Sequence, residues 1–388
     1  MTLKNLIFIL VMGCITFTAC TPDEVVDPIE PVVDYTERFS DAADVYANIV
    51  FASYEDSYNE AVALRDMINE FVANPTEEGF EACKDQWLAA RVPYGQTEVY
   101  RFYGGPIDDE DGPEGLINAW PMDENFIDYV DGDATAGLIN DATTYPEITK
   151  QVLVDLNEAI SEESIFTGYH AIEFLLWGQD LFADSPGQRP YTDYVVGGTA
   201  DNQERRAEYL TVVTDLLVDH LGEVMAEWTP GASNYRASFL AETQVSIVNK
   251  IFTALGELSK GELSGERMFV AVDSEDQENE HSCFADNTHV DILENFNGLV
   301  NVYTGTYERV SGSTVNGESY SAIGTDINPT KAAAIDEAIA TADAAIKAIP
   351  IPFDQAIIND QVLVLAAVTA LENLSDAFTD IQVDLENQ

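Results

Sequence analysis

Apolar residues recur every three or four positions along most of this chain, which is the spacing of an amphipathic helix. In the segment 39–72, for example, Val45, Ile49 and Ala52 fall on one helical face. The same spacing predicts further helices over 76–103 (with a kink at Pro93), 145–160, 167–177, 202–228, 235–260, 288–303, 330–348 and 354–386. The sequence has no repeated hairpin pattern and no alternation of strands with helices. It therefore predicts an all-α fold, and roughly eight long helices suit two packed helical-bundle domains better than one bundle.

Irregular stretches separate some of these helices. They are rich in Gly, Pro, Ser or Asp and cover 104–143, 261–287 and 307–328. The first contains Trp120 and Tyr129, and aromatic residues are scarce in disordered tracts, so we expect long ordered loops. We divide the folded part at residue 200, into a first helical-bundle region at 35–200 and a second at 201–388.

The N-terminus has the pattern of a bacterial secretory signal. Lys4 precedes the apolar run 6–15, and a small residue stands directly before Cys20. We expect a signal peptide at 1–19, a lipid on Cys20 and an extended Pro-rich and acidic tether at 20–34. An ordinary signal peptide with a chance cysteine is the alternative. No later segment looks apolar enough to span a membrane, so we expect the lipid to be the only anchor.

The formal net charge of −53 narrows the set of partners. Such a surface repels phosphate backbones, so we expect no nucleic-acid partner, whereas cations would accumulate near it. Two cysteines, Cys83 and Cys283, remain in the folded part. An exported protein can keep a disulfide, but sequence does not provide the Cα separation that decides it, so this bridge is left open.

The most pointed motif for chemistry is Gly168-Tyr169-His170-Ala171-Ile172-Glu173. His170 and Glu173 lie three residues apart, so on a helix they project from the same face. An imidazole and a carboxylate at this spacing can hold a metal ion, as related pairs do in helical di-iron bundles. The alternative is a structural pair whose members hydrogen-bond each other or the backbone.

A second candidate face lies on the helix before the first long loop. Arg91, Tyr94 and Glu98 follow the i, i+3, i+7 spacing, so they share one face. Arg91 could hold a carboxylate with a two-point fork, and Glu98 could add an oxygen ligand. A solvated charged face is the alternative, which the apolar neighbours Trp87 and Val99 weaken.

A third candidate segment, 278–291, carries two of the four histidines among acidic and hydroxyl residues. Asp286 can cap the following helix, and together with His289 it could also contribute to a metal or substrate pocket. The sequence contains no HExxH motif, no GxSxG motif and no phosphate-binding glycine loop. A zincin-type protease is therefore disfavoured.

Together these stretches resemble the imelysin family of exported bacterial proteins. The resemblance is carried by Trp87-Leu88-Ala89-Ala90-Arg91, Tyr94-Gly95-Gln96-Thr97-Glu98, Phe102-Tyr103-Gly104-Gly105-Pro106-Ile107-Asp108, the GxHxxE motif at 168–173, Glu280-His281-Ser282-Cys283-Phe284 and Asp286-Asn287-Thr288-His289. It runs from about residue 35 to the C-terminus and is strongest between 87 and 303. Ala285 stands where the family pattern has serine.

The resemblance implies two helical bundles, with a pocket near their interface that contains His170 and Glu173. It also implies a link to iron uptake, because related proteins include iron-regulated periplasmic and surface proteins. Some members are described as insulin-cleaving metallopeptidases. The missing zincin motif counts against that activity here.

From residues and resemblance we predict a lipid-anchored metal-binding protein that serves iron uptake. The expected metal ligands are His170, Glu173, Glu98 and Asp286, and the expected ligand-binding residues are Arg91, Tyr94, Ser282 and His289. The expected cargo is a divalent or ferric ion, bare or chelated, with iron first and zinc second. The alternatives are a metallopeptidase that uses the same pair and a surface binding or scaffold protein without metal. The expected partners are a bacterial membrane, most simply the outer one, reached through Cys20, and iron-transport proteins.

Overall fold

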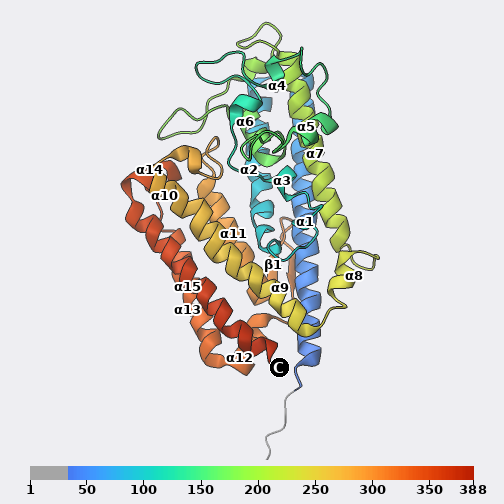
Figure 1. Cartoon of the computed structure of the whole chain (residues 1–388), viewed down its shortest axis with the longest axis vertical. Coiled ribbons are helices and arrows are strands. Elements are labelled where there is room, and N and C mark those ends of the chain that lie inside the picture. Colours follow the sequence, from blue (N-terminus) through green and yellow to red (C-terminus); the bar gives the residue numbers. More distant parts are fainter. Residues whose placement is uncertain (1–33) are drawn as a thin grey trace, which may run out of the picture. The chain divides into compact units, whose positions relative to one another are not determined.

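A computed structural model describes residues 34–388, and their secondary structure is almost entirely helical (Figure 1). The predicted signal peptide, the lipidation site Cys20 and all but the last residue of the tether lie outside the described residues. The α-helices are α1 (Thr36–Ala73), α2 (Glu77–Gly95), α3 (Glu114–Ile117), α4 (Gly137–Asn140), α5 (Lys150–Leu156), α6 (Gly168–Trp177), α7 (Gln203–Trp228), α8 (Tyr235–Phe239), α9 (Gln244–Glu257), α10 (Val270–Ser274), α11 (Thr288–Thr304), α12 (Tyr320–Ile327), α13 (Pro329–Ile346), α14 (Phe353–Asn359) and α15 (Gln361–Glu386). The all-α prediction is confirmed.

Shorter elements connect these helices. The 3₁₀ turns are η1 (Glu98–Tyr100), η2 (Glu124–Phe126), η3 (Tyr191–Tyr194) and η5 (Gln277–Asn279), and η4 (Leu258–Phe269) is a π-helix. Two short strands, β1 (Thr306–Glu308) and β2 (Thr314–Asn316), form an antiparallel hairpin in which Tyr307 pairs with Val315.

The helices pack in two groups. In one, α1 lies against α2 and α7; in the other, α15 lies against α9, α13 and η4, and both groups can be followed in Figure 1. Helix α11 contacts members of both, because it touches α2 as well as η4 and α13. Since α7 follows residue 200 and still packs on α1, the two predicted regions are in direct contact. The contacts group Tyr35–Gln388 as one unit, and the division at residue 200 stays a prediction.

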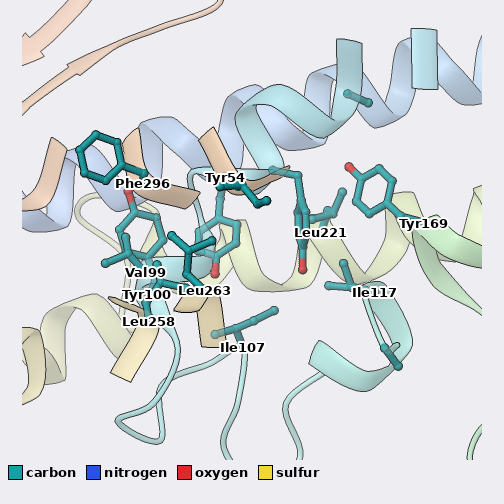
Figure 2. Close-up of a cluster of buried hydrophobic side chains, with 14 of the residues drawn as sticks. Tyr54, Val99, Tyr100, Ile107, Ile117, Tyr169, Leu221, Leu258, Leu263 and Phe296 are labelled. Atoms are coloured by element: carbon teal, nitrogen blue, oxygen red, sulfur yellow. The ribbon is translucent and has the colours of Figure 1, made fainter. Parts of the chain in front are cut away.

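One apolar core runs through the junction of the two groups. Figure 2 shows side chains from several elements in this buried cluster, among them Tyr54 of α1, Tyr100 of η1 and Leu263 of η4. The Tyr54 and Tyr100 rings lie 5.6 Å apart. Close approach of α11 to α2 depends on Gly298, where a Cβ atom would sit 2.6 Å from the backbone oxygen of Gln96. The polar site described below is built on this junction.

The segment 261–287 differs from its predicted irregular structure. The helix begun as α9 continues through η4 and α10 to Ser274, although Gly261 and Gly265 lie inside it. Glycine weakens a helix by roughly 0.5–1 kcal/mol relative to alanine. Burial of Leu258, Leu263 and Met268 offsets that loss, since each buried side chain of this kind contributes about 1.5–3 kcal/mol.

Helix α15 corrects another expectation, that no segment after the signal peptide is apolar enough to cross a membrane. With a mean hydropathy of 1.4, it meets the length and composition criteria for a span, and it is the one described helix that does. Its buried residues, including Leu371, Leu374 and Phe378, pack into the core. A core helix passes the same criteria, so its packing accounts for the hydropathy.

Cys83 and Cys283 are both buried and both free in the described part of the chain. Cys83 lies on α2, whereas Cys283 lies in the loop before α11. The disulfide that the sequence left open is therefore not formed.

Candidate functional site

The predicted motif helix, α6, starts at Gly168, and this residue fits because it has no side chain. Its φ of +82° is unfavourable for other residues, and a Cβ atom there would lie 2.4 Å from the backbone oxygen of Ile117. The chain at 117–120 therefore runs tightly against the start of α6. This approach brings the Trp120 ring to 4.9 Å from the imidazole of His170.

His170 and Glu173 form the predicted pair on one face of α6. His170 Nδ1 lies 2.8 Å from Glu173 Oε2, and Glu173 Oε1 accepts a hydrogen bond from the backbone N–H of Ala285 at 2.9 Å. Both side chains are fully buried, and burial raises the pKa of Glu173 and lowers that of His170. Both carboxyl oxygens of Glu173 are therefore engaged, one with His170 and one with the backbone of Ala285. The first of these contacts orients the His170 ring.

The second ring nitrogen of His170 has no hydrogen-bond partner among residues 34–388. This atom, Nε2, is buried. An unpaired buried polar atom costs about 1–3 kcal/mol, so each one in a folded protein calls for an explanation. A ligand that binds Nε2 is such an explanation.

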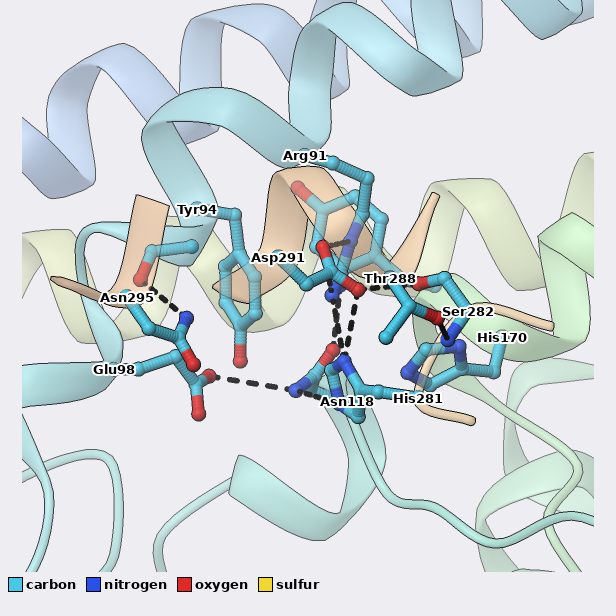
Figure 3. A network of polar contacts seen from close by, with 12 residues as sticks. Arg91, Tyr94, Glu98, Asn118, His170, His281, Ser282, Thr288, Asp291 and Asn295 are labelled. Atoms are coloured by element: carbon cyan, nitrogen blue, oxygen red, sulfur yellow. Dashed lines mark hydrogen bonds and ion pairs between the residues drawn. The ribbon is translucent and has the colours of Figure 1, made fainter. Parts of the chain in front are cut away.

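His281 supplies a second imidazole, and its ring centroid lies 4.7 Å from that of His170 (Figure 3). Its Nδ1 lies 2.9 Å from Asp291 Oδ2, and since a carboxylate only accepts, Nδ1–H is the donor. Nε2 is then the acceptor, 3.3 Å from the Nδ2 donor of Asn118. Burial lowers the pKa of His281 to about 4, so the ring is neutral at physiological pH.

Asp291 is fixed as an anion by its surroundings. Burial opposes its ionisation, but Arg91 at 3.0 Å, His281 and Ser282 outweigh this and hold the pKa of Asp291 far below its usual range. The Ser282 hydroxyl donates to Asp291 Oδ2. Asp291 thus orients His281 as Glu173 orients His170, an arrangement that raises the basicity of the other ring nitrogen and fixes the ring direction.

Arg91 and Tyr94 support this arrangement from α2. Arg91 donates to Asp291 and, at 2.6 Å, to Asn118 Oδ1. Its guanidinium carbon lies 5.0 Å from the Tyr169 ring centroid and 5.3 Å from that of Tyr94. The carboxylate that Arg91 was predicted to bind is therefore one of the chain's own.

Glu98 lies in the same network, but its carboxylate is paired with two arginines. Its Oε2 lies 2.8 Å from both Arg101 and Arg267. Burial opposes ionisation, yet these two guanidinium groups lower the pKa of Glu98 to about 2. Its other oxygen is 3.4 Å from Asn118 Nδ2, which links it to His281 without direct contact.

A cavity of about 370 Å³ opens beside the His281 imidazole, whereas His170 is fully buried behind its wall. Trp120 and His281 are in its wall, and His170 contacts both rings. Its charged lining consists of Glu114, Glu158, Glu262, Glu266, Arg101 and Arg267. Because carboxylates outnumber guanidinium groups, the cavity favours cations over anions.

Two of the predicted site residues do not join this network. Asp286 is one of them, and its pKa is raised to about 7 by burial first and then by the negative charges of Asp354 and Asp180. His289, in the first turn of α11, has its Nδ1 3.1 Å from the backbone oxygen of Asp286. Ser282 does join it, whereas His281 was not among the predicted ligands.

The donor set can be tested against a metal ion. Neutral imidazole nitrogens with carboxylate partners are typical ligands of iron, zinc and copper. Within the described range, no three His, Cys, Asp or Glu side chains are grouped so that they could hold a metal. The described residues therefore offer two neighbouring imidazole nitrogens, and His281 Nε2 would have to exchange its contact with Asn118 Nδ2 for a metal. The remaining ligands would have to come from water or from a molecule bound with the metal.

Fold and site together define an all-α protein with a buried imidazole–carboxylate pair on a GxHxxE helix. The chain belongs to the imelysin family, because the sequence profile described as Imelysin (peptidase M75) matches residues 50–378. The predicted family resemblance is confirmed.

The chain is also similar to individual proteins. It is 25% identical over 339 residues to iron-regulated protein A of Synechococcus elongatus, covering 84% of this chain and 81% of that protein. A crystal structure described as an iron-regulated protein A precursor from Parabacteroides distasonis has a TM-score of 0.70 and 18% identity, over 92% of this chain and 97% of that one. An imelysin-like protein from Psychrobacter arcticum has a TM-score of 0.64 and 17% identity, over 90% and 95%. At these identities the two structures support the fold alone.

Proposed function

We propose that this protein binds a transition-metal ion, with iron as its natural cargo, through His170 Nε2 and His281 Nε2, and that it serves iron uptake. The observation that carries the proposal is the buried, unpartnered Nε2 of His170 beside a second oriented imidazole. Family membership and the similarity to iron-regulated protein A favour iron over zinc.

In this proposal the roles of the site residues differ from those that the GxHxxE motif predicts. Glu173 and Asp291 hydrogen-bond to the two rings and hold their directions, and Arg91 fixes Asp291. The acidic cavity wall raises the local cation concentration. Export and lipid anchoring through Cys20 at a bacterial membrane complete the proposal, together with a transport partner that accepts the ion. This part rests on the N-terminal pattern alone.

The test is calorimetric titration of the chain from Thr21 onward with ferrous, ferric, zinc and cupric ions. We expect about one ion per chain, bound tightly in high salt, because the carboxylates of Glu173 and Asp291 pre-orient both rings. His170→Ala and His281→Ala should abolish this binding. Glu173→Gln, which keeps the shape of the side chain, should weaken it about 10–100-fold.

His289→Ala is the matched control, since His289 was predicted as a ligand-binding residue but its Nδ1 lies against the backbone oxygen of Asp286. It should bind as the wild type does. Circular dichroism establishes that every variant is folded. If the wild type and all variants bound equally and lost binding in high salt, the metal would be attracted only by the acidic surface. That result would overturn the proposal.

A metallopeptidase is the second candidate, and one group in the cavity favours it. Burial raises the pKa of Glu114 to about 7, where a carboxylate can act as a general base at neutral pH. The peptidase term in the family description points the same way. Peptide hydrolysis by the zinc-loaded chain that is lost in Glu114→Gln, with zinc still bound, would favour the enzyme. Metal binding without turnover would favour the binding protein.

A further inference from the structure

The π-helix η4 forms one wall of the cavity beside His281. Glu262, Glu266 and Arg267 of this helix line the cavity. π-helices are rare, mostly span a single turn inside an α-helix, and occur frequently at functional sites. η4 spans 12 residues, so it is long for its kind. A long stretch of such uncommon winding at the wall of a buried site points to a role beyond packing.

The π winding brings an acid and a base together on the cavity side of η4. In a π-helix the backbone hydrogen bonds join residues five apart, so such residues lie above one another. Glu262 and Arg267 are five apart, and Arg267 Nη2 donates to Glu262 Oε1 at 3.1 Å. In an α-helix of 3.6 residues per turn, the two side chains would point about 140° apart. The contact between them is therefore a product of the π winding.

This pair belongs to a cluster of alternating charges in the same wall. Glu98 Oε2 lies 2.8 Å from both Arg267 Nη2 and Arg101 Nη1. Arg101 Nη1 also lies 3.7 Å from Glu262 Oε1. The Arg267 and Glu98 side chains are 3% and 1% exposed, so salt and water screen their attraction little. The cluster thus fastens η4, in its π winding, to η1.

The same stretch of chain can also take the ordinary α winding. η4 continues α9 and leads into α10 without a break, so rewinding creates no new helix ends. The π state leaves Phe269 and Val270, at the junction with α10, 46% and 37% exposed. Because exposed apolar surface is unfavourable, the π winding is not favoured at this end of η4. η4 is therefore an element with two windings, and the charge cluster selects between them.

The buried imidazoles need an opening before an ion can reach them. His281 is 5% exposed, and His170 is fully buried behind the cavity wall. An ion that reaches both rings must pass the segments that form this wall, which include η4 and the chain around Trp120. Arg267 and His281 line the same cavity, so a movement of η4 changes the wall beside the ring.

We propose that η4 is the gate of the imidazole site. In the closed state, the π winding and the Arg267–Glu98 pair hold the wall shut. Rewinding toward an α-helix separates Arg267 from Glu262, withdraws part of the lining and admits a metal ion to His281 and His170. The cargo in this inference rests on the proposed function, whereas the change of winding does not depend on a metal.

A disulfide tests the gate by locking the π winding. Five residues of α-helix rise about 7.5 Å, more than the roughly 7 Å of Cα separation that a disulfide spans, whereas π winding stacks residues five apart. Glu262→Cys/Arg267→Cys, made in the full-length chain with Cys14→Ser and Cys20→Ser, should therefore form the bridge only when η4 is a π-helix. Glu262→Ser/Arg267→Ser in the same background is the matched control, because it lacks the same two charges and cannot be bridged.

Hydrogen exchange and zinc uptake are measured on both proteins, after circular dichroism has established that each is folded. We expect amides 258–270 to exchange at least about 10-fold more slowly in the bridged protein than in the serine variant, and amides of α7 to exchange equally. Zinc uptake, followed by stopped flow with a fluorescent zinc indicator in about 0.2 M NaCl, should slow by a similar factor. The wild type should lie between the two, because its Arg267–Glu262 contact can break.

Absence of the bridge in the folded, oxidised protein would mean that residues 262 and 267 do not meet, and it would overturn the proposal. Equal zinc uptake by the two proteins would also overturn it, because the ion would then enter without a movement of η4, for example past Trp120. If neither protein took up zinc but exchange in η4 still differed, the proposed metal site would fail. The exchange result would in that case still support η4 as the gate of the cavity.

Discussion

At the scale of single residues, hydrogen-bond saturation decides which side chains of the buried site can still take a ligand. Glu173 uses both oxygens, and Glu98 is held by two arginines. Arg91 donates its hydrogen bonds to Asp291 and Asn118. The unused capacity among these groups therefore lies on His170 Nε2, because both nitrogens of His281 already have partners.

Gly168→Ala tests how the site is positioned. The substitution adds a Cβ atom at a positive φ and 2.4 Å from the Ile117 oxygen. We expect a loss of about 3 kcal/mol or more in the free energy of unfolding, as strain and steric overlap add. Denaturant titration measures it.

Gly132→Ala is the matched control for this prediction. Gly132 has nearly the same φ, +83°, but an added Cβ would meet nothing within 4 Å. The Gly132→Ala variant should lose only about 1–2 kcal/mol in the free energy of unfolding, which is the cost of the positive φ for a residue with a side chain. Equal losses at the two positions would mean that the contact with Ile117 yields freely and does not position the site.

At this scale the sequence predicted part of the site and missed part for a physical reason. Helical spacing placed His170 and Glu173 on one face because that relation is local. His281 depends on Asp291, which Arg91 fixes from 200 positions away in the chain. No local pattern shows that these groups meet, so neither the second imidazole nor the supporting role of Glu173 was predictable.

At the scale of elements, a buried ion triplet joins α7 to two of the long loops. Asp128 Oδ2 lies 2.7 Å from Arg189 Nη1 and 2.6 Å from Arg206 Nε, and Arg206 Nη2 donates to Asp128 Oδ1 at 2.9 Å. Asp128 and Arg206 are fully buried. Loops as long as these stay ordered because their charges are bound to a core helix.

Asp128→Asn should therefore destabilise the protein strongly, by about 3–5 kcal/mol, because buried Arg206 loses its anion and Arg189 is left with Asp193 at 3.4 Å. Asp66→Asn is the control, since Asp66 makes a 2.8 Å pair with Arg65 at the surface. Its loss should be about 1 kcal/mol or less. Urea titration of both variants measures the loss in the free energy of unfolding. Similar losses for Asp128→Asn and Asp66→Asn would contradict the prediction.

The effect of Asp128 also has a defined pH dependence. Burial opposes ionisation, but Arg189 and Arg206 outweigh it and lower the pKa of Asp128 below its usual 3.8. The stabilisation is complete above the unfolded-state pKa and is lost as pH falls through the folded-state value. The stability gap between wild type and Asp128→Asn should thus narrow below about pH 4. A gap that widens on acidification would contradict this origin.

Helix positions were predictable wherever apolar spacing was uninterrupted. α1, α6, α7 and α11 lie within a few residues of their predicted ranges. The failures share a cause: glycine was taken to end a helix at 261, and the Gly- and Ser-rich segment 307–328 was taken as irregular. At residue 261, burial in the core keeps the chain helical through η4. In the segment 307–328, tertiary contacts support the β1–β2 hairpin and α12.

At the scale of the whole molecule, the contacts between the two helix groups predict a single cooperative unfolding of Tyr35–Gln388. Cys83 and Cys283 report on the two predicted regions separately, because one lies on each side of residue 200. Both are buried, and burial raises the pKa of Cys83 to about 12 and also raises that of Cys283. Neither thiol should react in the folded protein, since the thiolate is the nucleophile.

The experiment follows thiol labelling across a urea series in a chain with Cys14→Ser and Cys20→Ser. Single variants Cys83→Ser and Cys283→Ser isolate each reporter. We expect both thiols to become reactive at one common midpoint that coincides with the loss of helical circular dichroism. Two separate midpoints would instead support two domains that unfold independently, divided near residue 200.

The apolar character of α15 has a consequence for export. An exported chain must carry this helix through a translocation channel that releases sufficiently apolar segments sideways into lipid. Glu372, Asp376, Asp380 and Asp384 recur once per turn in its second half, and the first three are exposed in the folded protein. An aspartate at the centre of a membrane segment costs about 2.5–3.5 kcal/mol. Three of these acids pair with Lys260 or Lys331 in the folded protein. Under the proposed export, the same acidic row would oppose retention of this apolar helix in the bilayer.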